Sequence, residues 1–128
     1  MQDEQVILDT NAAFYRAFEK KDLAAMQKVW SHGIASICVH PGRGELKGWD
    51  AIESSWEKIF QNTAYLEIDT KIITVNRSGE LAYVVLIEKV LQVAQRRQQK
   101  AESMATNIFE RMGQDWYLVH HHGSPIVS

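Results

Sequence analysis

The segment that decides the fold lies near the end of the chain and reads Trp116-Tyr117-Leu118-Val119-His120-His121-His122-Gly123-Ser124. Successive side chains of a β-strand point to opposite faces of the sheet. Alternation therefore predicts one face made of Trp116, Leu118, His120 and His122, and a second face made of Tyr117, Val119 and His121. Because both faces begin with aromatic and aliphatic side chains, we expect a strand that is covered on both sides. We expect His120 and His122 to form the floor of a pocket, where the apolar partners end.

Three consecutive histidines also raise two other interpretations. An expression tag fits poorly, because the histidines lie inside an apolar pattern and Gly-Ser-Pro-Ile-Val-Ser follows them. A metal site would use His120 and His122, which point the same way, with His40 as a third ligand. No carboxylate can be placed beside them to orient the rings, so we predict neither a metal nor another cofactor.

Length and composition narrow the class of protein. The chain has 128 residues, and we expect residues 1–128 to form a single domain. Its 14 basic and 16 acidic residues form no long block of like charge, which argues against binding to nucleic acid or to an anionic membrane. The single cysteine, Cys38, excludes an internal disulfide. The opening Met-Gln-Asp-Glu-Gln lacks the features of a signal peptide, and no apolar run is long enough to cross a bilayer, so we expect a cytoplasmic protein.

Three helices are predicted in the first half of the chain, at residues 4–19, 23–30 and 49–61. In each of them apolar residues recur at helical spacing, and Asp22 is a suitable N-cap for the second. The third has the clearest apolar stripe, made of Trp49, Ile52, Trp56, Ile59 and Phe60. Two tryptophans on one stripe exceed what a short helix needs for docking, so we expect this helix to cover a concave surface.

From Tyr65 onward the period of the apolar pattern changes from helical to two. Long strands are predicted at residues 65–76, 80–94, 101–112 and 115–123, and a short strand at 34–39 runs into a glycine-rich loop. The long strands follow one another through short turns, so they should pair as antiparallel neighbours. Helices first and a meander afterwards indicate an α+β fold, in which three N-terminal helices pack on one face of a strongly curved, mainly antiparallel sheet.

Several motifs follow one another in a characteristic order: the strand leading into His40-Pro41-Gly42, Gly48-Trp49 at the start of a helix, Ala-Thr-Asn-Ile-Phe at 105–109, and the closing strand. Over nearly the whole chain they resemble the SnoaL-like branch of the nuclear transport factor 2 superfamily. The closing strand is also similar to that of the calcium/calmodulin-dependent kinase II association domain. The resemblance implies a cone of helices and bent sheet, open at its wide end and dimeric through the outer sheet face. It does not choose a function, because this fold carries isomerases, cyclases, dehydratases, hydrolases and oligomerisation modules.

His40 is the candidate catalytic residue. Its place after a strand and before a proline is similar to the place where ketosteroid isomerases hold their general-base aspartate. Because an imidazole has an ordinary pKa of about 6.5, it can accept a proton near neutral pH, and Trp49 and Trp56 should keep it neutral. The other interpretation is a histidine that hydrogen-bonds the backbone of its loop. Steroid isomerisation is not expected, since Phe14 occupies the place of the isomerase tyrosine, with Tyr15 one residue further round the helix.

Two more polar residues lie in the predicted strands. Asn107 shares a strand face with Ala105 and Phe109, where an amide is either a satisfied core group or a ligand contact. The resemblance to the kinase association domain implies an arginine near this position, and its absence argues against a carboxylate ligand held by arginines. Glu88 is the best carboxylate candidate near the middle of the sheet, but glutamate is usually exposed, so we expect a surface charge there.

Two functions are compatible with these observations. The first is a small-molecule site in the cone, for an apolar or aromatic ligand with a polar end. Its ligand-binding residues would be Trp49, Trp56, Asn107, His120 and His122, with His40 as the general base of an isomerase, cyclase, dehydratase or hydrolase. The second is a non-catalytic oligomerisation or interaction module with a vestigial pocket. Under either, strands that are apolar on both faces predict a homodimer through the outer sheet face. The sequence leaves open whether the protein is an enzyme.

Overall fold

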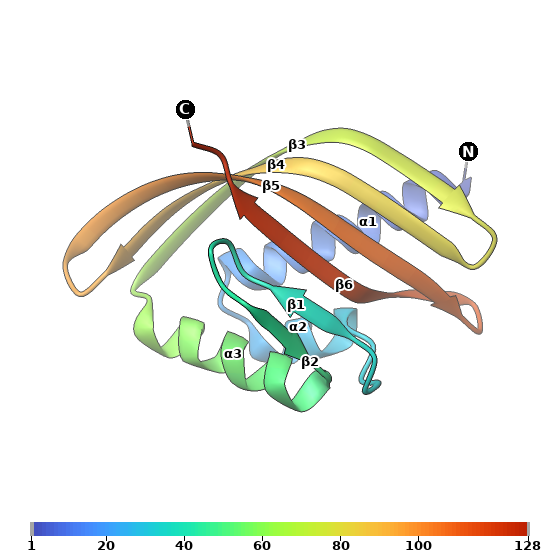
Figure 1. The fold of residues 1–128 in the computed structure, drawn as a ribbon, viewed down its shortest axis with the longest axis horizontal. Coiled ribbons are helices and arrows are strands. Elements are labelled where there is room, and N and C mark those ends of the chain that lie inside the picture. The colour runs from blue at the N-terminus through green and yellow to red at the C-terminus, as the bar shows by residue number, and fades with distance from the viewer. Residues whose placement is uncertain (1, 128) are drawn as a thin grey trace.

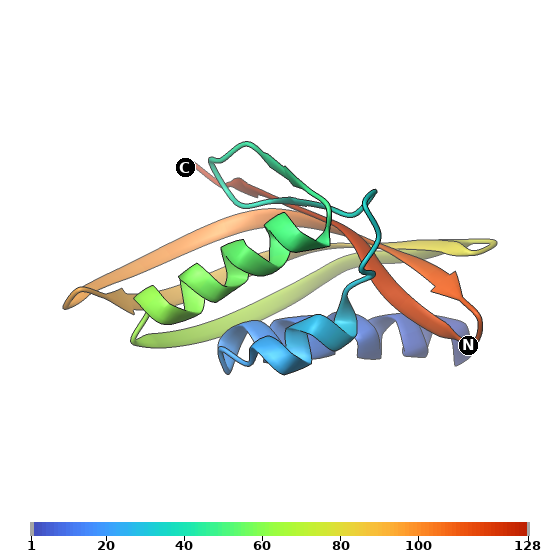
Figure 2. The ribbon, with the colours of Figure 1, turned by 90° about the horizontal axis from the view of Figure 1, so that it is seen from below.

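The computed structural model describes residues 2–127, which form three helices and a six-stranded sheet (Figure 1). The helices are α1 (Gln2–Glu19), α2 (Leu23–Val29) and α3 (Trp49–Asn62). All three lie on the same side of the curved sheet (Figure 2). The predicted α+β class, with N-terminal helices on one face of a mainly antiparallel sheet, is therefore confirmed. No helix within residues 2–127 combines the length and apolar character needed to cross a membrane.

The sheet places the last strand at its centre. Its strands are β1 (Ile37–Val39), β2 (Glu45–Lys47), β3 (Tyr65–Ser78), β4 (Leu81–Ala94), β5 (Arg97–Met112) and β6 (Asp115–Pro125). They lie in the order β2-β1-β6-β5-β4-β3, and only β1 and β6 pair in parallel. The four long strands were predicted. The short strand at 34–39 is confined to β1, and β2 was missed, because three residues are too few to display a period of two.

Local sequence explains where the helices begin and which face they bury. The carboxylate of Asp22 caps α2 by accepting a hydrogen bond from the backbone N–H of Ala25 at 3.0 Å. Gly48 precedes α3 with a φ of 88°, a left-handed conformation that glycine adopts without steric cost. The buried face of α3 carries Trp49, Ile52 and Trp56, as its apolar stripe predicted.

Aromatic side chains fill the space between the helices and the sheet. The ring of Phe14 contacts those of Trp30 and Trp56 edge to face, with centroids 6.2 Å and 5.7 Å away. The ring of Phe18 packs against Trp56 at 4.8 Å. On the sheet side, Leu118 is fully buried and its backbone carbonyl accepts a hydrogen bond from the N–H of Ser31 at 2.9 Å. These contacts tie α1, α2 and α3 to β6.

One extra residue changes the direction of every side chain in the second half of β6. Ile108 of β5 pairs with His120, but the next residue, Phe109, pairs with Leu118, so Val119 has no partner of its own. This is a β-bulge, which bends its strand and shifts its alternation by one residue. Trp116 and Leu118 face the helices as predicted, whereas beyond the bulge His121 and Gly123 are the buried residues. The prediction that His120 and His122 share the face of Trp116 was wrong.

Replacing Leu118 with alanine should lower the free energy of unfolding by about 2–5 kcal/mol, because the side chain is fully buried where the helices meet β6. Chemical denaturation monitored by circular dichroism would measure the loss. Leu81→Ala is the matched control, since Leu81 is 49% exposed and its truncation should change stability little. Equal losses in the two variants would contradict the assignment of Leu118 to the core.

Candidate functional site

Five polar side chains from four elements meet inside the core. They are Asn11 and Tyr15 of α1, Glu88 of β4, Asn107 of β5 and His121 of β6, and each is at most 6% exposed. Strand pairing brings the sheet residues together. Asn107 of β5 lies opposite His121 of β6 on one side and Val84 of β4 on the other. Glu88 lies four residues beyond Val84 on β4, so its side chain points to the same face of the sheet. Buried polar groups cost free energy unless they are hydrogen-bonded, so a cluster of this kind requires a connected network.

The hydrogen bonds of this cluster form a chain in which the donor and the acceptor of each bond can be assigned. An amide oxygen only accepts, so the ring Nδ1 of His121 donates to Oδ1 of Asn107 at 2.5 Å. The amide nitrogen of Asn107 in turn donates to Oδ1 of Asn11 at 2.9 Å and to the hydroxyl oxygen of Tyr15 at 3.1 Å. The hydroxyl group of Tyr15 donates its own hydrogen bond to Oε2 of Glu88 at 2.5 Å. Asn107 therefore orients the tyrosine so that its O–H bond points at the carboxyl group.

Burial shifts the ionisation of the whole cluster toward neutral forms. It raises the pKa of Glu88 above its ordinary value, an effect that the hydrogen bond from Tyr15 partly offsets. Burial, followed by the charge of Glu88, raises the pKa of Tyr15. Burial also lowers the pKa of His121 to about 3, so this ring is neutral at neutral pH. Its Nε2 lies 3.9 Å from Oε2 of Glu88 and forms no ion pair with it. Glu88 is thus the carboxyl group of the cluster, and its pKa is shifted upward, toward the protonated form.

His40 lies beside this cluster, at the end of β1. Its Nε2 is 2.8 Å from the hydroxyl of Ser55 on α3 and 3.8 Å from the sulfur of Cys38, and its ring meets that of Trp56 edge to face at 4.9 Å. Burial, followed by the positive charge of Arg43, lowers the pKa of His40 to about 4. The ring is therefore neutral at neutral pH, as expected, but burial lowers its pKa further than the modest desolvation that the sequence suggested.

Three of the predicted site residues come together and three do not. Asn107 belongs to the buried cluster, and His40 and Trp56 lie beside it, with the ring centroids of Trp56 and His121 6.5 Å apart. Trp49 lies elsewhere, about 10 Å earlier along the axis of α3, where it stacks on His32 at 4.5 Å. It was therefore wrong to expect Trp49 beside His40.

The bulge separates the remaining two predicted residues from the cluster. His120 and His122 lie on the outer face of the sheet, with ring centroids 6.0 Å apart, and His122 is exposed. They cannot form the polar floor of an interior pocket, and His40 cannot join them around one metal ion. Within residues 2–127 no group of three or more His, Cys, Asp or Glu side chains is arranged to hold a metal.

The sequence carried signals for the residues that were missed. Asn11 and Tyr15 occupy the same helical stripe as Ile7, Phe14 and Phe18, and polar residues within an apolar stripe are a mark of a buried site. Glu88 was expected on the surface, yet it is only 3% exposed and continues the inner row of Val84 and Leu86. The sequence does not show which face of β4 is the inner one, because the side chains on both faces are equally apolar. His121 could not be found without the bulge.

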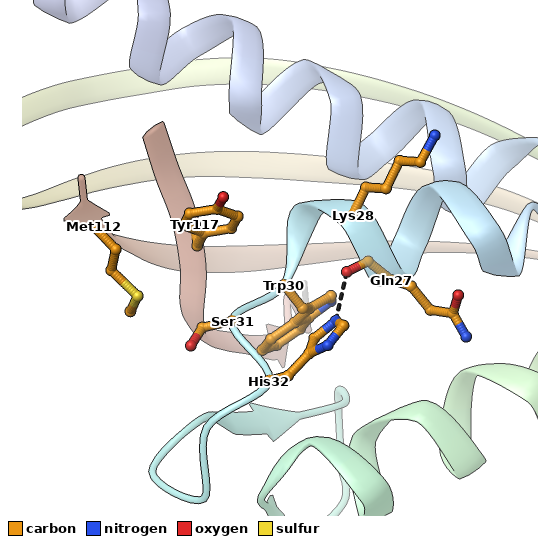
Figure 3. Close-up of a pocket in the computed structure, with 7 residues that line it drawn as sticks. All are labelled: Gln27, Lys28, Trp30, Ser31, His32, Met112 and Tyr117. Carbon is orange, nitrogen blue, oxygen red and sulfur yellow. Dashed lines mark hydrogen bonds between the residues drawn. The ribbon is translucent and has the colours of Figure 1, made fainter. Parts of the chain in front are cut away.

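A hollow on the surface of about 790 Å³ has a different lining from the buried cluster. It is lined by Gln27, Lys28, Trp30, Ser31, His32, Met112 and Tyr117 (Figure 3). The ring of His32 hydrogen-bonds the backbone carbonyl of Gln27 at 2.6 Å, which fixes one wall. A second hollow, of about 730 Å³, lies between the outer part of β3, β4 and β5 and the residues Pro125 and Ile126. Neither hollow is lined by a residue of the buried cluster. The second carries solvent-exposed carboxylates and lysines, such as the ion pair of Glu102 and Lys89. In the cluster, by contrast, a buried hydroxyl donates to a buried carboxyl group, so the cluster is the candidate site.

Two solved structures share the whole fold. A putative dehydratase of the NTF2-like family from Streptomyces avermitilis is 28% identical, with a TM-score of 0.92 over 99% of this chain and 98% of that one. A putative calcium/calmodulin-dependent protein kinase type II association domain from Thiobacillus denitrificans is 26% identical, with a TM-score of 0.82 over 92% of this chain and 93% of that one.

One curated relative is a longer protein that contains a segment similar to this chain. The F-box protein SKIP8 of Arabidopsis thaliana is 22% identical over 123 residues, which make up 96% of this chain and 51% of the relative. The chain thus spans about half the length of that relative. The family model described as SnoaL-like domain matches residues 7–128, nearly the entire sequence. With the cone fold and its buried polar cluster in place, the chain belongs to the SnoaL-like family of the NTF2-like superfamily.

Proposed function

We propose that the protein binds a small, largely apolar or aromatic molecule in the cone and transfers a proton to or from it through Glu88. The observation that carries this proposal is the 2.5 Å hydrogen bond from Tyr15 to a carboxyl group that is only 3% exposed. A buried carboxyl group with a raised pKa is suited to act as a general acid and base. The similarity to a putative dehydratase supports the same class of function.

The two oxygens of Glu88 would have different roles. Tyr15 holds Oε2, which leaves Oε1 for the substrate. In the loss of water, ionised Oε1 takes a proton from carbon, and the C–H electrons form the double bond as the neighbouring C–O bond breaks. The carboxyl group then gives the proton to the departing oxygen, so that water leaves and the carboxylate is regenerated. Migration of a double bond would use the same carboxyl group, with the proton returned to a different carbon.

The surrounding side chains suit a ligand without charge. His40 and His121 are neutral at neutral pH, and the rings of Phe14, Phe18 and Trp56 supply apolar walls. The indole Nε1 of Trp56 is buried without a hydrogen-bond partner, so it is available to an acceptor on the ligand. In this proposal His40 orients the polar end of the ligand, and the proton transfer belongs to Glu88, because a base with a pKa of about 4 is weak.

A second candidate function is assembly without catalysis. Two observations favour it: Phe14 and Trp56 themselves fill the interior beside His40, and the chain is similar to a putative association domain. The helices also leave the outer sheet face uncovered, with Val85 and Ile87 partly exposed and Tyr83 43% exposed. We propose that a second copy of the chain covers this face, as the sequence predicted, whether or not the interior is catalytic.

Replacing Glu88 with glutamine should lower turnover about 10²–10⁴-fold, because glutamine keeps the shape but cannot exchange a proton. A thermal-shift screen of neutral ketones, alcohols and aromatic compounds would first identify a ligand. Tyr15→Phe should also slow the reaction, while Tyr65→Phe is the matched control on an exposed tyrosine that hydrogen-bonds Glu67. Full activity in Glu88→Gln, together with loss in His40→Gln, would move the proton transfer back to His40.

The ionisation of Glu88 can be tested without a substrate. Its raised folded pKa means that folding favours the protonated form, so its contribution to stability is present below the ordinary pKa of 4.5 and is lost as pH rises through the folded pKa. Relative to the wild type, Glu88→Gln should therefore gain stability over this window, by about 1.4 kcal/mol for each pH unit between the two pKa values.

The measurement is the difference in unfolding free energy between Glu88→Gln and the wild type, taken across pH. The difference is needed because His40 and His121, with lowered pKa values, make both proteins more stable as pH rises toward 6.5. Glu67→Gln, on the other face of the sheet, is the control. A pH-independent difference would mean that Glu88 titrates at its ordinary value.

Introducing a charge on the outer sheet face should prevent the proposed dimer. Ile87→Asp places a carboxylate at the centre of the uncovered face, where burial against a second copy would be costly. Sedimentation velocity should give a dimer for the wild type at micromolar concentration and a folded monomer for the variant. Ile34→Asp is the control, because Ile34 is 86% exposed outside the sheet. A monomeric wild type would rule out this assembly.

A further inference from the structure

The second oxygen of Glu88 lies beneath a contact between Pro41 and Gly123. A Cβ atom added at Gly123 would lie 3.8 Å from Oε1 of Glu88 and only 3.0 Å from Cγ of Pro41. Gly123 is buried, whereas Pro41 is exposed, so the proline ring covers the glycine from outside. Since Tyr15 binds Oε2, this contact covers the side of the carboxyl group that the proposed chemistry uses.

The pairing of β1 with β6 places the proline there. The strands are parallel, with Cys38 opposite His121 and Val39 opposite His122, so the chain that leaves β1 passes the position of Gly123. In Figure 1 the connection from β1 to β2 lies beside the end of β6. We call residues 40–44 the cover loop.

The cover loop has an anchored base and an exposed tip. The ring of His40 is held by Ser55 at 2.8 Å, and the N–H of Arg43 donates to the carbonyl of His40 at 3.0 Å, which closes a tight turn. Gly42 supplies the φ of 76° that this turn requires. Residues 41–44 are exposed, and a Cβ at Gly44 would meet no atom within 4 Å. The tip is therefore exposed to solvent, with Pro41 lying close to Gly123.

We infer that Pro41 is the cover of the Glu88 site, and that the absence of a side chain at Gly123 determines which substrates reach Oε1. The inference rests on the proposed function and deepens it. While the proline lies on the glycine, a substrate cannot pass between them, so binding requires the cover loop to move outward. Once it has moved, no side chain of Gly123 stands beside Oε1, where a Cβ atom would lie 3.8 Å from that oxygen. A side chain at this position would therefore compete for space with a branch on the reacting carbon.

The cover can be tested without any substrate by comparing Pro41→Ala with Gly44→Ala. Removing most of the proline ring should let water reach Glu88, so the pKa of its carboxyl group should fall toward 4.5 by at least about 0.5 pH unit. A carbon-13 NMR titration, assigned with Glu88→Gln, measures this value. The other titratable groups around Glu88 are Tyr15 of α1, Cys38 of β1 and His121 of β6, and neither variant alters them.

Proton exchange provides a second readout that does not depend on titration. The Nδ1 proton of His121 is buried and hydrogen-bonded to Asn107, and its exchange with water should accelerate at least about tenfold in Pro41→Ala. Gly44→Ala should match the wild type in both measurements. If Pro41→Ala also matches the wild type in both, Pro41 does not cover the site. This result would leave the proposed chemistry untouched, since the test involves no turnover.

The role of Gly123 is tested with a substrate found for the proposed function. Gly123→Ala should reduce kcat/KM at least about tenfold for a substrate branched beside the reacting carbon, and less for its unbranched analogue, since one methylene changes discrimination by about this amount. A uniform loss for both substrates, or no loss, would overturn the selectivity assigned to Gly123. If no substrate is found at all, the proposed function fails, while the NMR comparison still decides the role of Pro41.

Discussion

The hydrogen bond from Tyr15 to Glu88 is the interaction on which the interior of the cone depends. A carboxyl group that is almost fully buried loses its hydration, and the cost is tolerated only where partners replace the water. The direct partner is Tyr15 of the helix, whose hydroxyl donates to the carboxyl group. Asn107 of β5 donates to that hydroxyl, and His121 of the central strand in turn donates to Asn107. Loss of any one link would leave another buried polar group without its partner, which makes the network all-or-none.

A single bulge makes this network geometrically possible. Without the extra residue Val119, strict alternation would turn His121 outward and leave Asn107 without the ring that fixes its amide. With it, the apolar half of β6 meets the helices and the polar half meets Glu88. The pattern of β6 predicted a strand covered on both faces. The strand does lie inside the sheet with its inner face buried, but His122 on its outer face is exposed. The pattern could not predict the bulge, because an unpaired residue is defined by the partner strand and leaves no mark in the sequence of its own strand.

Features that depend on nearby residues could be predicted from the sequence, and features that depend on a distant part of the chain could not. Helical stripes and the change of period gave the α+β fold, since those signals are local. Trp56 and Asn107 were assigned correctly to the interior because their neighbours at helical or strand spacing are apolar on that side. Glu88 was not, because Tyr83, Val85 and Ile87 make the outer face of β4 as apolar as the inner one. The burial of a charged residue there depends on Tyr15, which is 73 residues away in sequence.

The bulge also divides the histidines of β6 between the two faces of the sheet. On the inner face, His121 is neutral and enclosed, and it supports the tyrosine that faces Glu88. On the outer face, His120 and His122 lie next to the uncovered apolar surface of β4 and β5, where a second copy of the chain could pack. A sheet presents its two faces independently, so chemistry inside the cone and assembly outside it do not compete for the same side chains. The proposed enzymatic and associative functions are therefore compatible in one molecule, and a variant that abolishes one need not affect the other.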